Sequence, residues 1–266
     1  MTAITYNSLE VSKIYQEERL YRIMEYLEKS ESMTVNDICD IFQVSRDTAR
    51  RDIVKLTEQG AVIRTHGGIA LTKFVHKLNQ YAERQNNELE VKQRLGEYAA
   101  TFVTDNELIF LDVSTTVKCM IPHLGVKSLK VVTQSLDNAW MLMENESIQT
   151  YLLGGLICPE TRHLMSYDSL KKLADYRFNK VFLSAVGIHR EGIYYYHQDD
   201  VYFKRELVTR AEQVILVADH TKFEKCSFFK VLDFQMIDTM ITDQSLPQEL
   251  RESIEDAGVE LIIYNK

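Results

Sequence analysis

The chain has 266 residues, of which 45% are hydrophobic and 26% charged, with only 3 prolines and 10 glycines. This is the composition of a folded protein with one large domain or two ordinary ones, and it excludes disordered, collagen-like and low-complexity chains. The formal net charge of −8 excludes a protein that is basic throughout, so any surface that binds nucleic acid has to be local.

The cysteine and histidine patterns exclude the common metal and disulfide scaffolds. The four cysteines form no C-x-x-C pair, and the seven histidines form no H-x-x-x-H pattern. We therefore expect free thiols in a reducing cytosol, no metal and no cofactor. The N-terminus lacks the pattern of a signal peptide, and the apolar runs are far shorter than the roughly 18 residues of a membrane helix, which predicts a cytoplasmic protein without a membrane segment.

Amphipathic helices are predicted at the start of the chain. Leu20, Ile23 and Leu27 recur at helical spacing and mark the apolar face of the first helix. Thr34, with Asp37 three residues later, has the pattern of a capping box for a second helix.

A third helix and a ribbon follow. Ser45 is the predicted N-cap of this helix, Ala49, Ile53 and Leu56 form its apolar stripe, and Gly60 ends it. A short β ribbon with a Gly-Gly turn comes next. This order predicts a winged helix-turn-helix over residues 17–71, in which a tight turn joins the second and third helices and the β ribbon is the wing.

The remainder of the chain predicts a second domain. The polar stretch 72–90 is the expected linker, and from 91 to 266 apolar strand-like runs alternate with amphipathic helices. This alternation predicts an α/β fold with a parallel sheet covered on both faces, where ligands bind beyond the carboxyl ends of the strands. The predicted strands are 108–111, 131–133, 150–153, 181–185, 214–218, 240–242 and 261–264. The predicted helices include 136–144, 170–176, 201–210 and 248–256.

Positive charge gathers on the third helix and the wing. Residues 45–66 hold five basic and three acidic side chains, whereas residues 1–71 hold nine basic and eleven acidic ones. An ordinary solvated helix face would explain the charges alone. The combination of turn, caps, basic face and wing within one short stretch favours a surface that reads DNA.

The basic side chains of the third helix lie opposite its apolar stripe. On a helical wheel, Arg50, Arg51 and Lys55 point away from the core, which suits contacts to guanine edges or phosphates in the major groove. Arg64 and His66, beside the wing turn, are placed to reach the DNA backbone or the minor groove. The predicted DNA-binding residues are Ser45, Arg46, Thr48, Arg50, Arg51, Lys55, Arg64 and His66.

This segment resembles the helix-turn-helix of the DeoR-type bacterial transcription regulators. The residues that match the family signature are Arg19, Ile23, Leu27, Ser45, Thr48, Ala49, Arg50, Arg51, Asp52, Ile53, Gly60, Arg64, His66, Gly67 and Gly68. The resemblance implies a sequence-specific regulator, with repression of carbohydrate-related genes, that binds a double-stranded DNA operator as a homodimer or homotetramer. Residues 1–16 precede the match and have no assigned role. For Asp52 we expect a structural role, through an ion pair with Arg19 or an orienting hydrogen bond to Arg51.

The resemblance extends over nearly the whole chain. It implies a C-terminal domain similar to ribose-5-phosphate isomerase that senses a phosphorylated sugar or similar metabolite. Hydroxyls and N–H groups at a strand-to-helix turn can hold a phosphate, with Lys204, Arg205 and Lys222 as counter-charges. The expected effector-binding residues are Asp112, Ser114, Thr115, Thr116, Thr133, Ser135, Gly154, Gly155, Lys204 and Lys222.

The second domain departs from the family at three places. Ser114 and Ser166 stand where the family has glycine, and Tyr194, Tyr195, Tyr196 and His197 replace small residues after Gly192. Glycine adopts positive φ and admits close approach of a ligand more easily than serine does. Either the cavity takes a different ligand or none, or the serines are tolerated and the tyrosines are packing residues.

Two other classes of function remain as alternatives. A phosphosugar isomerase with an accessory helix-turn-helix would use Asp112, Asp219 and Lys222 as acid and base groups. Because a shared fold does not confer activity, we expect the protein not to be an enzyme. A module that uses the helix-turn-helix only for dimerisation would be separated from a regulator by a DNA-binding assay.

Overall fold

The computed structural model describes residues 15–30, 32–65, 67–71, 81–159 and 161–265. Its contacts divide the chain into two units, residues 1–75 and residues 76–266. This division falls inside the stretch 72–90 that was predicted as a linker. Part of that stretch, from Tyr81 to Asn86, forms the helix α5 instead of an irregular connection.

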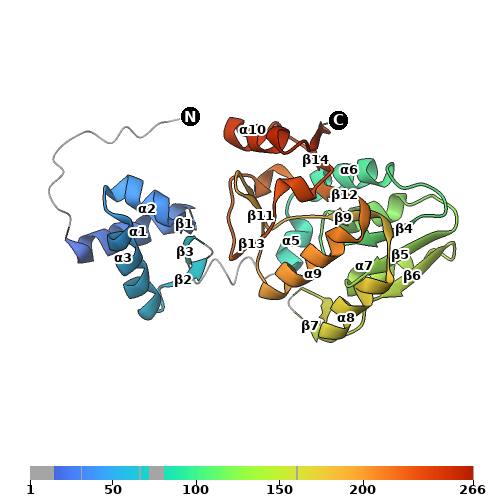
Figure 1. Ribbon diagram of the computed structural model, residues 1–266, viewed down its shortest axis with the longest axis horizontal. Helices are drawn as coiled ribbons and strands as arrows, with labels where there is room; N and C mark the ends of the chain where they lie inside the picture. The colour runs from blue at the N-terminus through green and yellow to red at the C-terminus, as the bar shows by residue number, and fades with distance from the viewer. Residues whose placement is uncertain (1–14, 31, 66, 72–80, 160, 266) are drawn as a thin grey trace. The chain divides into compact units, whose positions relative to one another are not determined.

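Unit 1 contains the predicted helices and ribbon, and one further strand (Figure 1). Its elements are α1 (Gln16–Ser30), β1 (Ser32–Thr34), α2 (Val35–Phe42), α3 (Arg46–Glu58), β2 (Val62–Thr65) and β3 (Gly68–Leu71). The apolar positions predicted from helical spacing are confirmed as core residues. The core is formed by Leu20, Ile23, Leu27, Met33, Ile38, Ala49, Ile53, Leu56, Val62 and Ile69.

The ends of the helices follow the local sequence. Thr34 and Asp37 form a complete capping box at the start of α2, and the Ser45 hydroxyl accepts a hydrogen bond from the N–H of Thr48 at the start of α3. Gly60 follows α3 with a φ of +69°, a left-handed conformation that glycine adopts without strain. These predicted caps are confirmed.

The wing is a three-stranded sheet in the order β1-β3-β2, where the sequence predicted only two strands. The additional strand β1 pairs antiparallel with β3 and ends in the N-cap of α2. Gly68 makes this pairing possible, because a Cβ at this position would lie 1.9 Å from the carbonyl oxygen of Met33.

Unit 2 is built on a parallel sheet of seven strands in the order β15-β14-β12-β9-β4-β5-β6. These strands are β4 (Leu108–Leu111), β5 (Leu129–Thr133), β6 (Ile148–Leu152), β9 (Phe178–Leu183), β12 (Ala211–Val217), β14 (Thr239–Thr242) and β15 (Glu260–Ile263). The helices and 3-10 turns are α6 (Leu89–Ala100), η1 (Val117–His123), α7 (Leu136–Leu142), α8 (Tyr167–Lys172), η2 (Leu173–Asp175), α9 (Gln198–Thr209), η3 (His220–Lys222), η4 (Phe234–Met236) and α10 (Gln248–Asp256). The predicted fold is confirmed, and strand boundaries differ from the prediction by a few residues.

The sheet has an apolar core on each face. Within β4, Phe110 packs with residues of α9 and α10, whereas Ile109 and Leu111 pack with residues of α6, η1 and α7. Both faces are thus covered, and the strands read as continuous apolar runs, as expected for a buried parallel sheet. Of the helices in the described residues, none is long and apolar enough to cross a membrane.

Two small antiparallel elements were not predicted. One is a three-stranded sheet of β10 (Gly187–His189), β11 (Gly192–Tyr195) and β13 (Phe229–Leu232), and the other is a hairpin of β7 (Leu156–Cys158) and β8 (His163–Met165). Their strands have three or four residues each, too few for a periodic pattern. They matter because residues in and beside β8 and β11 line the cavity described below.

Candidate functional site

A buried ion pair fixes α3 against α1. The Asp52 carboxylate accepts hydrogen bonds from Arg19 Nε at 2.5 Å and Arg19 Nη2 at 3.1 Å, and from Gln16 Nε2 at 3.0 Å. Asp52 is fully buried, and Arg19 is 7% exposed. Of the two partners expected for Asp52, the structure shows Arg19, so the carboxylate orients the helix from its inner side.

The opposite side of α3 presents its cations to solvent. Arg50 and Arg51 are exposed, and Lys55 is half-buried. Their charged groups form no hydrogen bond or ion pair with any residue that the structure describes. Arg64 is exposed on β2, whereas Arg46 Nη2 donates to Asn36 Oδ1 of α2 at 2.8 Å. The outer face of α3 therefore carries charges that no side chain in the described part of the chain neutralises.

The remaining predicted DNA contacts lie at the start of α3 and in the wing. Ser45 and Thr48 are joined through their hydroxyl oxygens at 2.9 Å, at the end of the helix where backbone N–H groups favour an anion. His66 lies outside the described residues.

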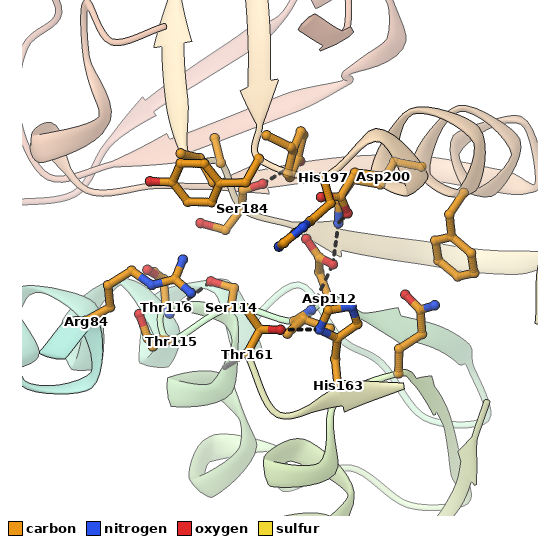
Figure 2. Close-up of a pocket in the computed structure, with 18 of the residues that line it drawn as sticks. Arg84, Asp112, Ser114, Thr115, Thr116, Thr161, His163, Ser184, His197 and Asp200 are labelled. Carbon is orange, nitrogen blue, oxygen red and sulfur yellow. Dashed lines mark hydrogen bonds and ion pairs between the residues drawn. The ribbon is translucent and has the colours of Figure 1, made fainter. Parts of the chain in front are cut away.

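A cavity opens in unit 2 beyond the carboxyl ends of β4 and β9 (Figure 2). Its position matches the rule that open α/β sheets bind ligands at this edge. The lining residues are Arg84, Asp112, Val113, Ser114, Thr115, Thr116, Gln134, Thr161, His163, Met165, Ser184, Ala185, Val186, Tyr195, Tyr196, His197, Asp200, Phe203, Lys204 and Lys222.

Some of the expected effector-binding residues lie outside this cavity, because their polar groups serve the fold. Thr133 Oγ1 donates to the carbonyl oxygen of Leu111 at 2.7 Å, and Ser135 caps α7. The carbonyl oxygen of Gly154 accepts bonds from two serine hydroxyls of the α8 cap. Gly155 is pressed against the backbone of β8. The cavity does contain Asp112, Ser114, Thr115, Thr116, Lys204 and Lys222.

The loop after β4 is a compact turn. Ser114 Oγ accepts hydrogen bonds from the N–H groups of Thr116 at 3.0 Å and Val117 at 3.2 Å. Ser114 has no positive φ, so this position does not require glycine. The hydroxyls of Thr115 and Thr116 form no hydrogen bond with another described residue. The serine thus supports the loop, and the two threonines offer their hydroxyls to the cavity.

Lys222 supplies a charge beside this loop. Burial lowers the pKa of Lys222 to about 8, although the nearby Asp219 carboxylate opposes the shift. The ammonium has no hydrogen-bonding or ion-pairing partner among the described residues. Arg84 of α5 lines the same part of the cavity, where Figure 2 shows it next to Thr115 and Thr116. This corner combines cations with hydroxyl groups and suits an anion.

The second expected lysine of the cavity is already paired. Lys204 Nζ lies 2.6 Å from Asp112 Oδ1 and 3.7 Å from Asp200 Oδ1, and 4.5 Å from the centre of the Tyr195 ring. Two carboxylates share this one ammonium, so Lys204 is not available as a counter-charge. Arg205, also expected as a counter-charge, turns away and donates to the carbonyl oxygen of Val231.

The three consecutive tyrosines have different surroundings. Tyr195 donates its hydroxyl to the carbonyl oxygen of Ser184 at 2.5 Å and lines the cavity, as does Tyr196. Tyr194 points elsewhere and donates to Glu191 at 3.1 Å. Two of the three tyrosines therefore shape the cavity wall.

Two histidines of the cavity were missed by sequence reasoning. His163 comes from β8, and burial, followed by the nearby His197 and Lys204, lowers its pKa to about 4. Its Nδ1 lies 2.5 Å from Thr161 Oγ1. The rings of His163 and His197 are 6.3 Å apart. Thr161, Ser184 and Asp200 were missed as well. No sequence motif marks these residues, because they come from the β7–β8 hairpin, the end of β9 and the start of α9, which only the fold brings together.

Comparison with known proteins covers both units. Residues 19–74 match the family model of the DeoR-like helix-turn-helix domain, and residues 87–244 match that of the DeoR C terminal sensor domain. The chain is 39% identical to the HTH-type transcriptional repressor GlcR of Bacillus subtilis over 250 residues, which cover 94% of this chain and 97% of that protein. It is 30% identical to the HTH-type transcriptional regulator IolR of Bacillus subtilis over 241 residues, covering 87% and 92%. A solved ribose 5-phosphate isomerase A from Neisseria gonorrhoeae aligns with 17% identity and a TM-score of 0.35, over 50% of this chain and 53% of that one.

Proposed function

The chain belongs to the DeoR family of transcriptional regulators, and on that premise we propose that the exposed face of α3 reads an operator and that an anionic ligand in unit 2 controls this binding. The observation that carries the first part is the row of unneutralised cations on α3. The opposite side of the same helix is fixed in the core by Asp52 and the apolar stripe. A helix held in this way presents a rigid basic surface to the major groove.

Within this surface we assign base contacts to some residues and phosphate contacts to others. Arg50 and Arg51 are fully available for guanine edges, where arginine makes its most specific contacts. Arg46, Lys55 and Arg64 are placed for phosphates, which fix the position of a protein on DNA without reading the sequence. Ser45 and Thr48 add hydroxyl and N–H groups at the start of α3, and His66 is assigned to the wing contact from the sequence alone.

The test is a comparison of two arginine variants on DNA selected from a random pool by the full chain. Arg51→Ala should weaken binding by about 5-fold or more, since a base-reading arginine contributes about 1–3 kcal/mol. Arg251→Ala is the matched control, because Arg251 is an exposed arginine of α10 that pairs with Glu255 in unit 2. Equal affinities of the two variants by fluorescence anisotropy would remove Arg51 from the DNA interface.

For the effector we propose a phosphorylated sugar or a related metabolite, which links the protein to carbohydrate-related genes. Its phosphate would lie between the 114–116 loop, Lys222 and Arg84, where cations and free hydroxyls meet. A phosphate accepts several charge-assisted hydrogen bonds at once, which matches this set of donors. Inorganic phosphate and at least one member of a panel of sugar phosphates should raise the melting temperature of unit 2, because a ligand that binds the folded state stabilises it. A panel without effect would contradict this assignment.

The same geometry suggests how the ligand acts on DNA binding. Arg84 lies in α5, the described helix that follows the connection to unit 1. Gln85 of α5 donates to Asp137 of α7 at 3.0 Å, and Lys92 Nζ donates to the carbonyl oxygen of Arg84 at 2.7 Å. A phosphate that draws the Arg84 side chain into the cavity would change these contacts of α5. It would so favour one placement of the connection that leads to unit 1. Control requires that the ligand prefers one arrangement of the protein over another.

We further propose that the protein represses transcription as a homodimer or homotetramer and has no enzymatic activity. One winged unit contacts few base pairs, and two copies on half-sites separated by whole helical turns give useful affinity. Sedimentation of the full chain with and without operator tests this, and a monomer bound to a single half-site would contradict it. The enzymatic alternative is not favoured by the relatives, which are transcriptional regulators.

A further inference from the structure

The cavity of unit 2 has two chemically different ends (Figure 2). The basic end holds Arg84, Thr115, Thr116 and Lys222. The other end, called here the histidine end, holds Asp112, His163, His197 and Asp200, and Ser184 lines the cavity between the two ends. Figure 2 shows the labelled histidines well separated from Arg84 across the cavity.

The histidine end has no positive charge to offer a ligand. Its one ammonium, that of Lys204, is shared by the carboxylates of Asp112 and Asp200, at 2.6 Å and 3.7 Å. One ammonium thus faces two carboxyl groups, which leaves no unpaired positive charge of Lys204 for a ligand. A second anionic group on a ligand would lie beside Asp112 and Asp200 in poorly solvated surroundings, where the one ammonium is already paired.

The histidine end does have hydrogen-bonding groups that a ligand could use. His163 is neutral near pH 7, because its pKa is lowered to about 4. The Nε2 atom of His197 is buried and forms no hydrogen bond within the described part of the chain. The Ser184 hydroxyl likewise bonds to no described residue. A buried ring nitrogen without a partner is unfavourable, and a ligand hydroxyl satisfies it in either tautomer because a hydroxyl both donates and accepts.

We propose that His197 recognises the uncharged, hydroxyl-bearing end of the effector, and that the effector is the monophosphate of a neutral sugar or polyol, not a bisphosphate or a phosphorylated sugar acid. The inference rests on the proposed function, since it takes the basic end of the cavity as the phosphate site. His163 and Ser184 supply further hydrogen bonds to the same end of the ligand. Asp112 and Asp200 exclude a second negative charge there.

Matched pairs of ligands test the exclusion of charge. Glycerol 3-phosphate and 3-phosphoglycerate differ by a terminal hydroxymethyl group in place of a carboxylate, and so do sorbitol 6-phosphate and 6-phosphogluconate. Binding of each compound to the full chain is measured by calorimetry, with inorganic phosphate as the minimal probe. We expect the polyol phosphate of a pair to bind at least about 10-fold more tightly than the acid, and at least one polyol phosphate to bind more tightly than inorganic phosphate.

The outcomes separate this inference from the proposed function. If inorganic phosphate binds but the acids bind as tightly as the polyol phosphates, the inference is overturned and the phosphate site stands. The same holds if no polyol phosphate binds more tightly than inorganic phosphate. If neither phosphate nor any of the four compounds binds, the proposed effector site is itself refuted, and this inference falls with it.

Variants of His197 test the assigned residue. His197→Phe keeps a ring and removes both nitrogens, and should weaken binding of the preferred polyol phosphate by about 10-fold while leaving that of inorganic phosphate unchanged. His197→Gln keeps a donor and an acceptor and should recover part of the loss. His123→Phe, at an exposed histidine of η1, is the control. The assignment is overturned if His197→Phe weakens the binding of inorganic phosphate and of the polyol phosphate equally, and His197→Gln recovers none of the affinity. That result would show that His197 has a structural role.

Discussion

The ion pair between Asp52 and Arg19 leads to a quantitative prediction for unit 1. Asp52→Ala removes the acceptor of three hydrogen bonds and leaves the guanidinium of Arg19, which is 7% exposed, inside the core without its counter-charge. Breaking a buried pair by removing one partner costs about 3–5 kcal/mol. For a small domain this corresponds to a melting temperature lower by about 12 °C or more, at about 4 °C per kcal/mol.

The assay is differential scanning calorimetry of the full chain, with circular dichroism to follow the loss of helix. Glu18→Ala is the control, because the Arg22–Glu18 pair has a similar distance of 2.7 Å but both side chains are 51% exposed. An exposed pair of this kind contributes at most about 1 kcal/mol. Asp52→Ala should also lose operator binding, since the pair sets the orientation of α3.

Two results would refute this reasoning. One is a loss of stability in Asp52→Ala no larger than that in Glu18→Ala. The other is a double variant, Arg19→Met with Asp52→Leu, that is as unstable as Asp52→Ala. Apolar residues of similar volume usually replace a buried ion pair without loss, so this double variant should recover most of the stability.

Three further predictions concern DNA binding, the cavity and the wing. Operator affinity should fall by orders of magnitude between about 50 and 200 mM salt, as measured by anisotropy, and a flat response would contradict phosphate contacts. Because Lys222 has a pKa of about 8, its ammonium is half deprotonated at that pH, so phosphate affinity in calorimetry should be about 2-fold lower at pH 8 than well below it and should then fall by up to about 10-fold per pH unit. Lys222→Arg should abolish this fall, and a fall that persists would assign it to another group. Gly68→Ala should destabilise unit 1 by about 2 kcal/mol or more in calorimetry, since the new Cβ meets the backbone of β1, whereas Gly125→Ala, which meets no atom within 4 Å, should not.

Features that depend on neighbouring residues in the chain were predictable. The capping box at Thr34, the N-cap at Ser45 and the left-handed Gly60 follow from short-range sequence patterns, and all three are present. The seven strands of the parallel sheet were also predictable, since a strand buried on both faces is a continuous apolar run. The two partners considered for Asp52 could not be separated by sequence, because the choice depends on how α1 packs on α3.

Features that depend on the assembled fold were not predictable. β1 has only three residues and becomes a strand because β3 lies beside it. Thr133 and Gly154 match a binding pattern, yet the Thr133 hydroxyl donates to Leu111 at the end of β4, and the Gly154 carbonyl oxygen accepts from the serines that cap α8. Arg84 lies in a stretch whose polar composition resembles a linker, and His197 follows a run of tyrosines. Arg84 reaches the cavity because it lies in α5, and His197 reaches it because α9 begins directly after it.

The central claim is that a ligand in unit 2 controls the affinity of α3 for DNA. The most direct measurement is the operator Kd of the full chain, titrated with the sugar monophosphate that stabilises it most, beside the same titration of Lys222→Met. We predict that the ligand raises the Kd of the wild-type chain at least about 5-fold, a coupling of about 1 kcal/mol, and leaves that of Lys222→Met unchanged. An operator Kd of the wild-type chain that stays constant while the ligand is bound would contradict the account.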